Sequence, residues 1–89
     1  MRIGGNVDQI GDLHNHFTRN GDNVEALRSE LRGYVHNTDW QGTAATRFRE
    51  DWTNDFEPAL NRIEEALRLA GAEARNRADA LRQADAVHG

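Results

Sequence analysis

The sequence contains no cysteine and no lysine, and it has one proline among its 89 residues. Without cysteine, neither a disulfide framework nor a thiolate metal site can hold the fold together. No apolar run approaches the ~20 residues of a transmembrane helix, and Met1–Gly5 lacks the apolar core of a secretory signal peptide. We therefore expect no membrane span, and we expect any export to use a route that does not depend on an N-terminal signal.

Positive charge and large apolar side chains are also scarce. All eleven basic residues are arginine, fifteen acidic residues outnumber them, and the net charge is −4. An acidic chain without a basic stripe is a poor nucleic-acid binder, so we expect no nucleic-acid partner. Leu, Ile, Val and Phe together number seventeen. On folding, a domain this short buries only ~60% of the surface that its unfolded chain exposes. Much of the stability should therefore come from a partner.

The first half of the chain has a seven-residue apolar repeat that predicts one helix over about 7–36. One seam position carries Ile3, Ile10, Phe17, Val24 and Leu31, and the position three residues further on carries Asn6, Leu13, Asn20, Leu27 and Tyr34. Asn20 and Gly21 weaken the pattern near its middle. The simpler interpretation is a weak spot that tertiary packing rescues. The alternative is a polar residue that sets helix register, as buried asparagines do in coiled coils.

Turn-forming residues at 36–39 predict a turn over about 37–42 and a second helix over about 43–86. Pro58 interrupts the second helix because its ring removes a backbone N–H donor. Either a continuous helix kinks there, or the helix restarts with Asp55 as an N-cap. The apolar stripe crosses Pro58 without losing phase, which favours the kink. The large apolar members of this stripe are Phe48, Trp52, Phe56, Leu60, Ile63 and Leu67.

Together the stripes predict an all-α fold, a single domain over residues 1–89 that forms an antiparallel helix-turn-helix hairpin. A lone hairpin leaves one flank of its apolar stripe in water, so we expect it to pack against a second helical hairpin. We place on that flank the side chains of Val7, Val35, Phe56 and Leu60.

Trp40 and Gly42 lie in the predicted turn, where a large aromatic side chain can close the end of the helix seam. A glycine there lets the backbone bend and lets another helix come near. A Trp-x-Gly sequence near the centre of a short chain, between two long helices, resembles the WXG family of early-secretory-antigen-like proteins. Phe48 and Trp52 stand where that family has an aromatic or aliphatic pair, and the likeness covers essentially the whole chain.

This resemblance implies a substrate of a bacterial type VII secretion system, or the dimer partner of one. Such proteins are made in the cytoplasm and exported folded, as homodimers or heterodimers that form four-helix bundles. Many carry a Tyr-x-x-x-Asp or Tyr-x-x-x-Glu export motif, and the matching stretch here contains Leu81 and Asp85. Leucine in place of tyrosine favours a heterodimer whose companion supplies the tyrosine to the secretion ATPase, over a homodimer that the ATPase recognises directly.

Candidate catalytic and metal-binding groups are few. His14 and His16 point in different directions on a helix and cannot chelate one ion, so we expect substitution of either to do little. No phosphate-binding loop or nucleophile elbow can be built, so we expect no enzymatic activity, no cofactor and no metal site. The charged residues of the second helix predict a solvated face with local ion pairs; they include Glu64, Glu65, Arg68, Glu73, Arg75 and Arg77.

An alternative function belongs to a different class of protein. The hairpin could be a structural adaptor that is not exported, or the N-terminal targeting module of a secreted toxin. Presence of the chain in culture supernatant would separate export from an adaptor role. The sequence leaves open which companion the chain has and what the pair does after export.

Overall fold

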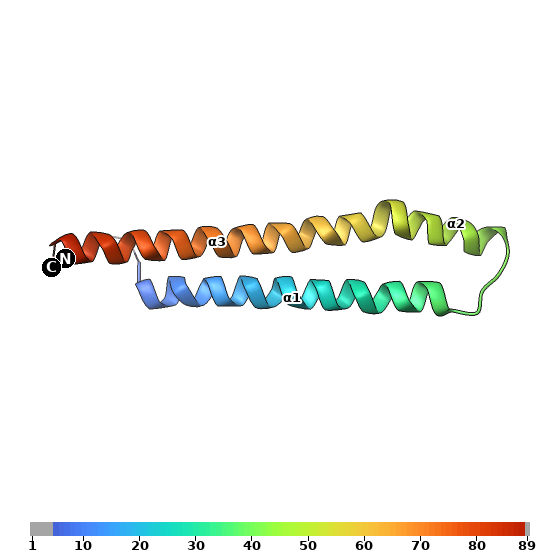
Figure 1. Ribbon diagram of the computed structural model, residues 1–89, viewed down its shortest axis with the longest axis horizontal. Coiled ribbons are helices and arrows are strands. Elements are labelled where there is room, and N and C mark those ends of the chain that lie inside the picture. The colour runs from blue at the N-terminus through green and yellow to red at the C-terminus, as the bar shows by residue number, and fades with distance from the viewer. Residues whose placement is uncertain (1–4, 89) are drawn as a thin grey trace.

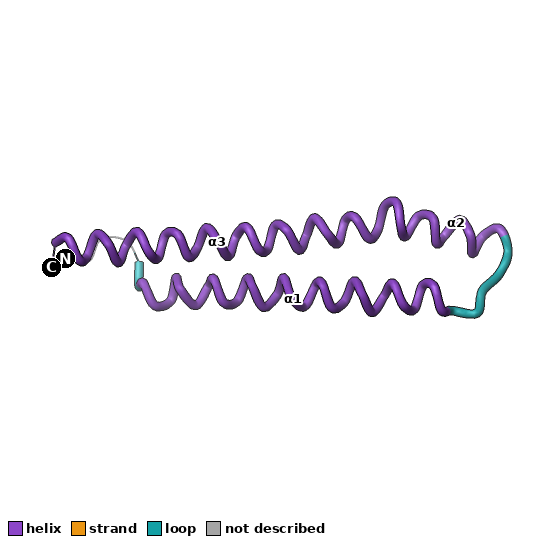
Figure 2. Tube along the Cα trace, viewed as in Figure 1, coloured by secondary structure: helices purple, strands orange, loops and turns teal. Residues whose placement is uncertain are grey.

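The chain folds into a long antiparallel helical hairpin (Figure 1), which confirms the predicted fold class. This computed structural model describes residues 5–88, and side chains are described for residues 5–84. Ile3 and the side chain of Asp85 lie outside those ranges. No strand occurs in the described part of the chain (Figure 2), and no helix there is long and apolar enough to cross a membrane. The molecule is a rod of 68 × 16 × 13 Å.

The first arm is helix α1, Val7–Asn37. Its N-cap is Asn6, whose side-chain oxygen accepts hydrogen bonds from the backbone N–H groups of Asp8 at 2.9 Å and Gln9 at 3.1 Å. These bonds satisfy two of the N–H groups that every helix leaves without a partner in its first turn. Asn6 therefore caps the helix, although the seven-residue repeat had assigned it to the seam.

The second arm is one continuous helical path with three parts, α2 (Thr43–Asp51), the π-helical turn η1 (Trp52–Phe56) and α3 (Glu57–His88). In η1 the backbone N–H of Glu57 donates to the carbonyl of Trp52, five residues earlier. Pro58 accounts for this wider turn, because its ring has no N–H and would crowd the carbonyl four residues earlier in a regular α-helix. The continuous helix is confirmed. The alternative restart is wrong, because Asp55 lies inside the π-helical turn.

Glycines allow the two arms to approach each other. Gly21 is buried, and a Cβ atom built there would lie 3.2 Å from Cγ of Arg68 on α3. In the same way, a Cβ atom at Gly71 would lie 3.2 Å from Cβ of Phe17 on α1. Helix α1 runs through Asn20 and Gly21 without interruption. The simpler interpretation of this pair is therefore confirmed within the hairpin, because tertiary packing stabilises a locally weak sequence.

The core between the arms is thin. Among the described residues no large side chain is fully buried, and the buried hydrophobic side chains are those of Ala45, Trp52 and Ala78. Larger side chains along both arms are only half-buried between them; they include Ile10, Phe17, Val24, Leu31, Leu60 and Leu67. Each half-buried side chain yields only part of the ~1.5–3 kcal/mol that full burial contributes. The hairpin alone therefore has little hydrophobic stabilisation.

Candidate functional site

Seven of the eight large apolar side chains that are exposed in the described part of the chain form a surface that we call the apolar face, and the eighth, Leu69, lies on another side of α3. Each has at least 41% of its surface exposed. Contiguous exposed apolar surface on a small protein marks a site of interaction. The members of the apolar face are Leu13, Leu27, Tyr34, Trp40, Phe48, Phe56 and Ile63.

Contacts near the turn place the two rows of this face on the same side of the hairpin. Tyr34 of α1 and Phe48 of α2 line one groove, and the Phe48 ring lies 6.3 Å from the ring of Phe56. The members on α1 recur at multiples of seven residues, as do Phe56 and Ile63 on the second arm. Residues seven apart stay on nearly the same side of a helix, so both rows continue along this side of the rod.

The seam predicted for α1 is divided between two surfaces. Its first position is half-buried against α3, whereas its second position is exposed on the apolar face. The apolar stripe is wider than a single neighbouring helix can cover. The predicted flank was accordingly wrong in three of its four members, because Val7, Val35 and Leu60 are half-buried and only Phe56 is exposed.

Aromatic rings are concentrated where the apolar face meets the turn. The ring centroids of Trp40 and Phe48 lie 5.7 Å apart with the planes tilted by 49°, and those of Phe48 and Phe56 lie 6.3 Å apart with a tilt of 43°. Tilted ring pairs at such distances are favourable beyond the area that they bury. Trp40 thus covers the end of the seam by packing on Phe48, and it is still 42% exposed. Exposed aromatic side chains of this kind are typical anchors of protein interfaces.

Trp52, the other tryptophan, has the opposite environment. Its side chain is 6% exposed, and its indole N–H has no hydrogen-bond partner among the described residues. Phe48 and Trp52 therefore have different environments, although both stand at the positions where the family has its aromatic or aliphatic pair. Trp52 belongs to the packing within the hairpin, and Phe48 belongs to the exposed surface.

The turn that carries Trp40 is held at both of its ends. Gly42 has φ +107°, a conformation that L side chains rarely adopt, and it precedes α2 as its N-cap. No atom lies within 4 Å of a Cβ built at Gly42. Glycine is therefore required here by the backbone conformation of the bend and not by close packing within the chain. At the other end, the guanidinium of Arg49 donates to the carbonyls of Val35 at 3.0 Å and Thr38 at 2.8 Å. Sequence reasoning missed Arg49, because nothing local shows that it reaches the end of α1.

Charged side chains form a network between the arms at mid-length. Glu64 of α3 accepts hydrogen bonds from Arg28 of α1 and from Arg68 on its own helix, and Arg68 also pairs with Asp22 at 3.0 Å and Glu25 at 3.2 Å. Hydrogen bonds from Arg28 and then Arg68 hold the pKa of Glu64 below its usual value. The predicted solvated face was wrong for Glu64 and Arg68, because both are half-buried and bridge the two helices.

Other charges behave as the sequence indicated. Arg77 donates to Glu73 at 2.8 Å across one helical turn, and both side chains are exposed. Such pairs contribute only a few tenths of a kcal/mol each. The local pattern predicts these pairs correctly because both partners lie on one helix.

The two histidines differ in a way that their spacing did not reveal. His16 is exposed, whereas His14 is half-buried and its Nδ1 lies 2.9 Å from the carbonyl oxygen of Gly71 on α3. A carbonyl only accepts, so Nδ1 of His14 is the donor of this hydrogen bond between the arms. The expectation that substitution of His14 does little stays a prediction, although this hydrogen bond joins residues that lie 57 positions apart in the sequence.

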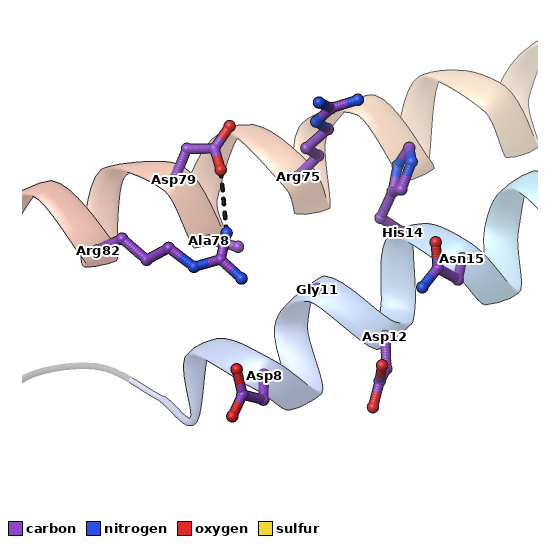
Figure 3. A pocket seen from close by; sticks show the side chains of 9 residues that line it. All are labelled: Asp8, Gly11, Asp12, His14, Asn15, Arg75, Ala78, Asp79 and Arg82. Atoms are coloured by element: carbon purple, nitrogen blue, oxygen red, sulfur yellow. Dashed lines mark hydrogen bonds and ion pairs between the residues drawn. The ribbon is translucent and has the colours of Figure 1, made fainter.

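A polar groove lies beside His14 between α1 and α3, near the open end of the hairpin (Figure 3). Asp8 and Asp12 line it from α1, and Arg75 and Asp79 line it from α3. Arg82 reaches over the groove and donates to Asp79 at 3.2 Å. Charges of both signs are mixed here, and no group of three or more metal-ligating side chains occurs in the part of the chain that is described.

The stretch that matches the export motif lies within α3, because that helix continues to His88. Leu81 is half-buried. Leu81 therefore packs toward the hairpin with part of its surface exposed, and Asp85 follows one turn later on the same helix.

Comparison with known proteins identifies a family that the chain matches. A family model described as "WXG100: Proteins of 100 residues with WXG" matches residues 2–86. The matched range includes both arms of the hairpin, the turn with Trp40 and Gly42, and the Leu81 to Asp85 stretch. No curated protein and no solved structure matches the chain.

Proposed function

Because the chain belongs to the WXG100 family, we propose that it leaves the cell through a type VII secretion system, as a substrate or as the dimer partner of one. The family is associated with substrates of this system, and its members are secreted without signal peptides. The proposed activity is helical packing and involves no chemical step, so we propose that the chain is not an enzyme.

The apolar face is the observation that carries this proposal. It leaves Leu27, Tyr34, Phe56 and Ile63 each at least 45% exposed along one side of the rod. A second helical hairpin fits such a surface, because two helices laid along two helices bury apolar rows on both sides and form a four-helix bundle. We propose that the partner in export is a second WXG-type hairpin.

Leu81 favours a companion that is a different chain. Tyrosine is a frequent interface anchor because a flat ring and a hydroxyl act together, and leucine keeps only apolar bulk at that position. We therefore propose that the companion supplies the tyrosine and that the secretion ATPase reaches this chain through the companion. The neighbouring gene should then encode a second hairpin that ends in Tyr-x-x-x-Asp or Tyr-x-x-x-Glu.

Secretion into culture supernatant tests the proposal, with a cytoplasmic protein as the lysis control. Leu27→Glu places a charge on the apolar face and should abolish export by preventing pairing. The matched control is Leu69→Glu, because Leu69 is 71% exposed and lies about 100° around α3 from the row that contains Ile63. Equal export of the two variants would contradict pairing through the apolar face.

Two further strains test the role of the companion. Deletion of the companion gene should abolish export, and Asp85→Ala in this chain should alter it little. Normal export without any companion, combined with loss of export in Asp85→Ala, would show that Leu81 and Asp85 form a working signal. That result would overturn the partner role proposed here.

A further inference from the structure

The side chains of the second arm that face α1 form a row that we call the interior row. Its members repeat every seven residues before η1, from Ala45 to Trp52, and again after it, from Leu60 to Leu67. Ala45 and Trp52 are buried, and the two leucines are half-buried between the arms. Across η1, however, the step from Trp52 to Leu60 is eight residues. The interior row therefore contains one extra residue, and that residue falls at the π-helical turn.

The row of the same arm on the apolar face contains the same extra residue. Phe48 and Phe56 lie eight residues apart, and Ile63 follows seven residues later. All three side chains are at least 41% exposed. The ring centroids of Phe48 and Phe56 are nevertheless only 6.3 Å apart, so the two rings lie on one side of the arm. Two rows on different sides of the helix thus change their interval at the same place.

A regular α-helix cannot keep either row in line across a step of eight residues. At about 100° per residue, seven residues fall about 20° short of two full turns, whereas eight residues exceed two turns by about 80°. A turn closed by i→i+5 hydrogen bonds holds one residue more than a turn closed by i→i+4 bonds. The hydrogen bond from the N–H of Glu57 to the carbonyl of Trp52 closes such a turn. It absorbs the extra residue and brings both rows back into line.

A regular helix through residues 52–56 would exchange a buried ring for a buried charge. Trp52 lies eleven residues before Ile63, and Arg49 lies eleven residues before Leu60. Eleven residues of regular helix return to within about 20° of the same direction. Trp52 would then take the exposed direction of Ile63, and Arg49 would take the direction of Leu60 between the arms. Both changes are unfavourable, because one exposes a large apolar ring to water and the other buries a charge.

We propose that η1 corrects the rotational phase of the second arm, so that Trp52 stays inside the hairpin while the rings of Phe48 and Phe56 meet on its surface. Packing creates the need for a wider turn between Trp52 and Leu60. Pro58 fixes the place of that turn, because its ring has no N–H and disfavours a regular turn directly before it. Pro58 is therefore a positioning residue for the exposed rings. This role belongs to the single chain and holds whatever partner covers the apolar face.

Deletion of the extra residue tests the phase directly. In a purified chain that carries Pro58→Ala, deletion of Asn54, an exposed residue of η1, shortens both eight-residue steps to seven. The second arm should then form a regular α-helix with both rows in line. Circular dichroism should show unchanged helicity, and the melting temperature should lie within about 5 °C of that of Pro58→Ala alone.

The matched control is deletion of Asn23, an exposed asparagine of α1, in the same Pro58→Ala background. Helix α1 contains no wider turn that could absorb the loss. The deletion therefore rotates one half of α1 by about 100° against the other half and turns apolar side chains away from α3. The melting temperature should fall by about 15 °C or more.

Pro58→Ala without a deletion separates packing from the proline as the cause of the wider turn. Alanine supplies the missing N–H, but the eight-residue steps remain, so the wider turn should persist without a fixed place. With Trp40→Phe in each variant, Trp52 is the sole tryptophan, and its emission should stay at the short wavelength of a buried ring. Nuclear Overhauser contacts between the Phe48 and Phe56 rings should also persist. Amide exchange over residues 52–60 should become faster, with exchange over residues 10–31 of α1 unchanged.

Three results would overturn the proposal. The first is equal destabilisation by the two deletions, which would mean that η1 corrects no phase. The second is a shift of Trp52 emission to longer wavelength in Pro58→Ala, which would mean that the proline alone creates the wider turn. The third is unchanged amide exchange in Pro58→Ala, which would mean that Pro58 does not fix its place. All measurements use the purified chain at a concentration at which the wild type is helical, so a failure of export would not affect them.

Discussion

Two tryptophans in this chain have opposite surroundings, and their roles differ accordingly. Trp52 is 6% exposed between the arms, and Trp40 is 42% exposed beside Phe48. Truncation of a buried aromatic side chain removes both its transfer free energy and its packing contacts. A half-exposed ring contributes less of both, because water contacts much of its surface in the folded protein. Trp52 thus stabilises the hairpin, and Trp40 is available to a partner.

We predict that Trp52→Ala lowers the free energy of unfolding by about 3–5 kcal/mol, and that Trp40→Ala lowers it by about 1–2 kcal/mol. Trp52→Phe keeps most of the packing and removes an indole N–H that has no partner among the described residues, so it should cost less than about 1 kcal/mol. Denaturant unfolding followed by circular dichroism measures all three. A loss for Trp40→Ala equal to that for Trp52→Ala would contradict this division of roles.

Glycines 33 and 42 form a second pair of residues with opposite requirements. Gly42 needs φ +107°, whereas Gly33 lies inside α1, and a Cβ built there has no atom within 4 Å. We predict that Gly42→Ala destabilises the chain by about 1–3 kcal/mol through backbone strain. Gly33→Ala should stabilise it by about 0.5–1 kcal/mol, because alanine loses less conformational entropy in a helix. Thermal melts of the two variants should therefore shift in opposite directions, and shifts of the same sign would refute the assignment.

At the scale of the helices, the arms are joined by a few specific contacts rather than by a continuous core. Glu64 links α3 to Arg28 of α1, Arg68 lies over Gly21, and His14 reaches the carbonyl of Gly71. Long polar side chains fill space where a larger core would have apolar ones, and their methylene groups can cover apolar surface while their charges are paired. The alignment of the arms therefore depends on charged groups and should respond to pH.

We predict that acid destabilises the hairpin partly through Glu64. Its folded pKa lies below its ordinary value of 4.5, so its contribution is fully present above the unfolded pKa and is lost as the pH falls through the lower folded pKa. The melting temperature should therefore fall below about pH 4.5, and less steeply in Glu64→Gln. Glu65→Gln, at an exposed neighbouring position, is the control and should follow the wild type. Identical pH profiles for Glu64→Gln and the wild type would refute this role.

At the scale of the whole molecule, the hairpin has the proportions of half a bundle. A rod only 16 × 13 Å in cross-section is two helices wide and one helix thick, so every apolar side chain in the described part of the chain lies near a surface. Folding must still offset roughly 1–2 kcal/mol of backbone entropy per residue. A thin hairpin buries little apolar surface to offset this entropy. Pairing with a second hairpin buries more apolar surface along the full length of the rod.

We predict that the stability of the isolated chain depends on its concentration, because pairing draws the folded state toward the dimer by mass action. Melting temperatures from circular dichroism should rise as the concentration of the chain rises across a wide dilution series, and sedimentation should show a matching shift from monomer to dimer. A chain that remains monomeric and melts cooperatively at one temperature throughout the series would contradict this view of the fold.

Much of this architecture follows from local sequence. Apolar residues at intervals of seven determine the first helix, and apolar residues at intervals of four and three determine the second. One proline perturbs the second helix, and the stretch with Trp40 and Gly42 separates the two helices. These features involve residues within one or two turns of each other, which is why periodicity and turn chemistry predict them. The family resemblance rests on the same stretch, and the family match over residues 2–86 confirms it.

Only the tertiary structure decided which side of each stripe faces the other arm. Periodicity shows that α1 has a wide apolar stripe, but the rotation of the helix against α3 placed Val35 inside and Leu27 outside. Contacts between residues far apart in the sequence, such as His14 and Gly71, could not be predicted either, because local spacing holds no information about the position of one arm along the other. Close approach of the arms at the glycines determined this relative position. The packing of the arms in turn determined which residues remain exposed to a partner.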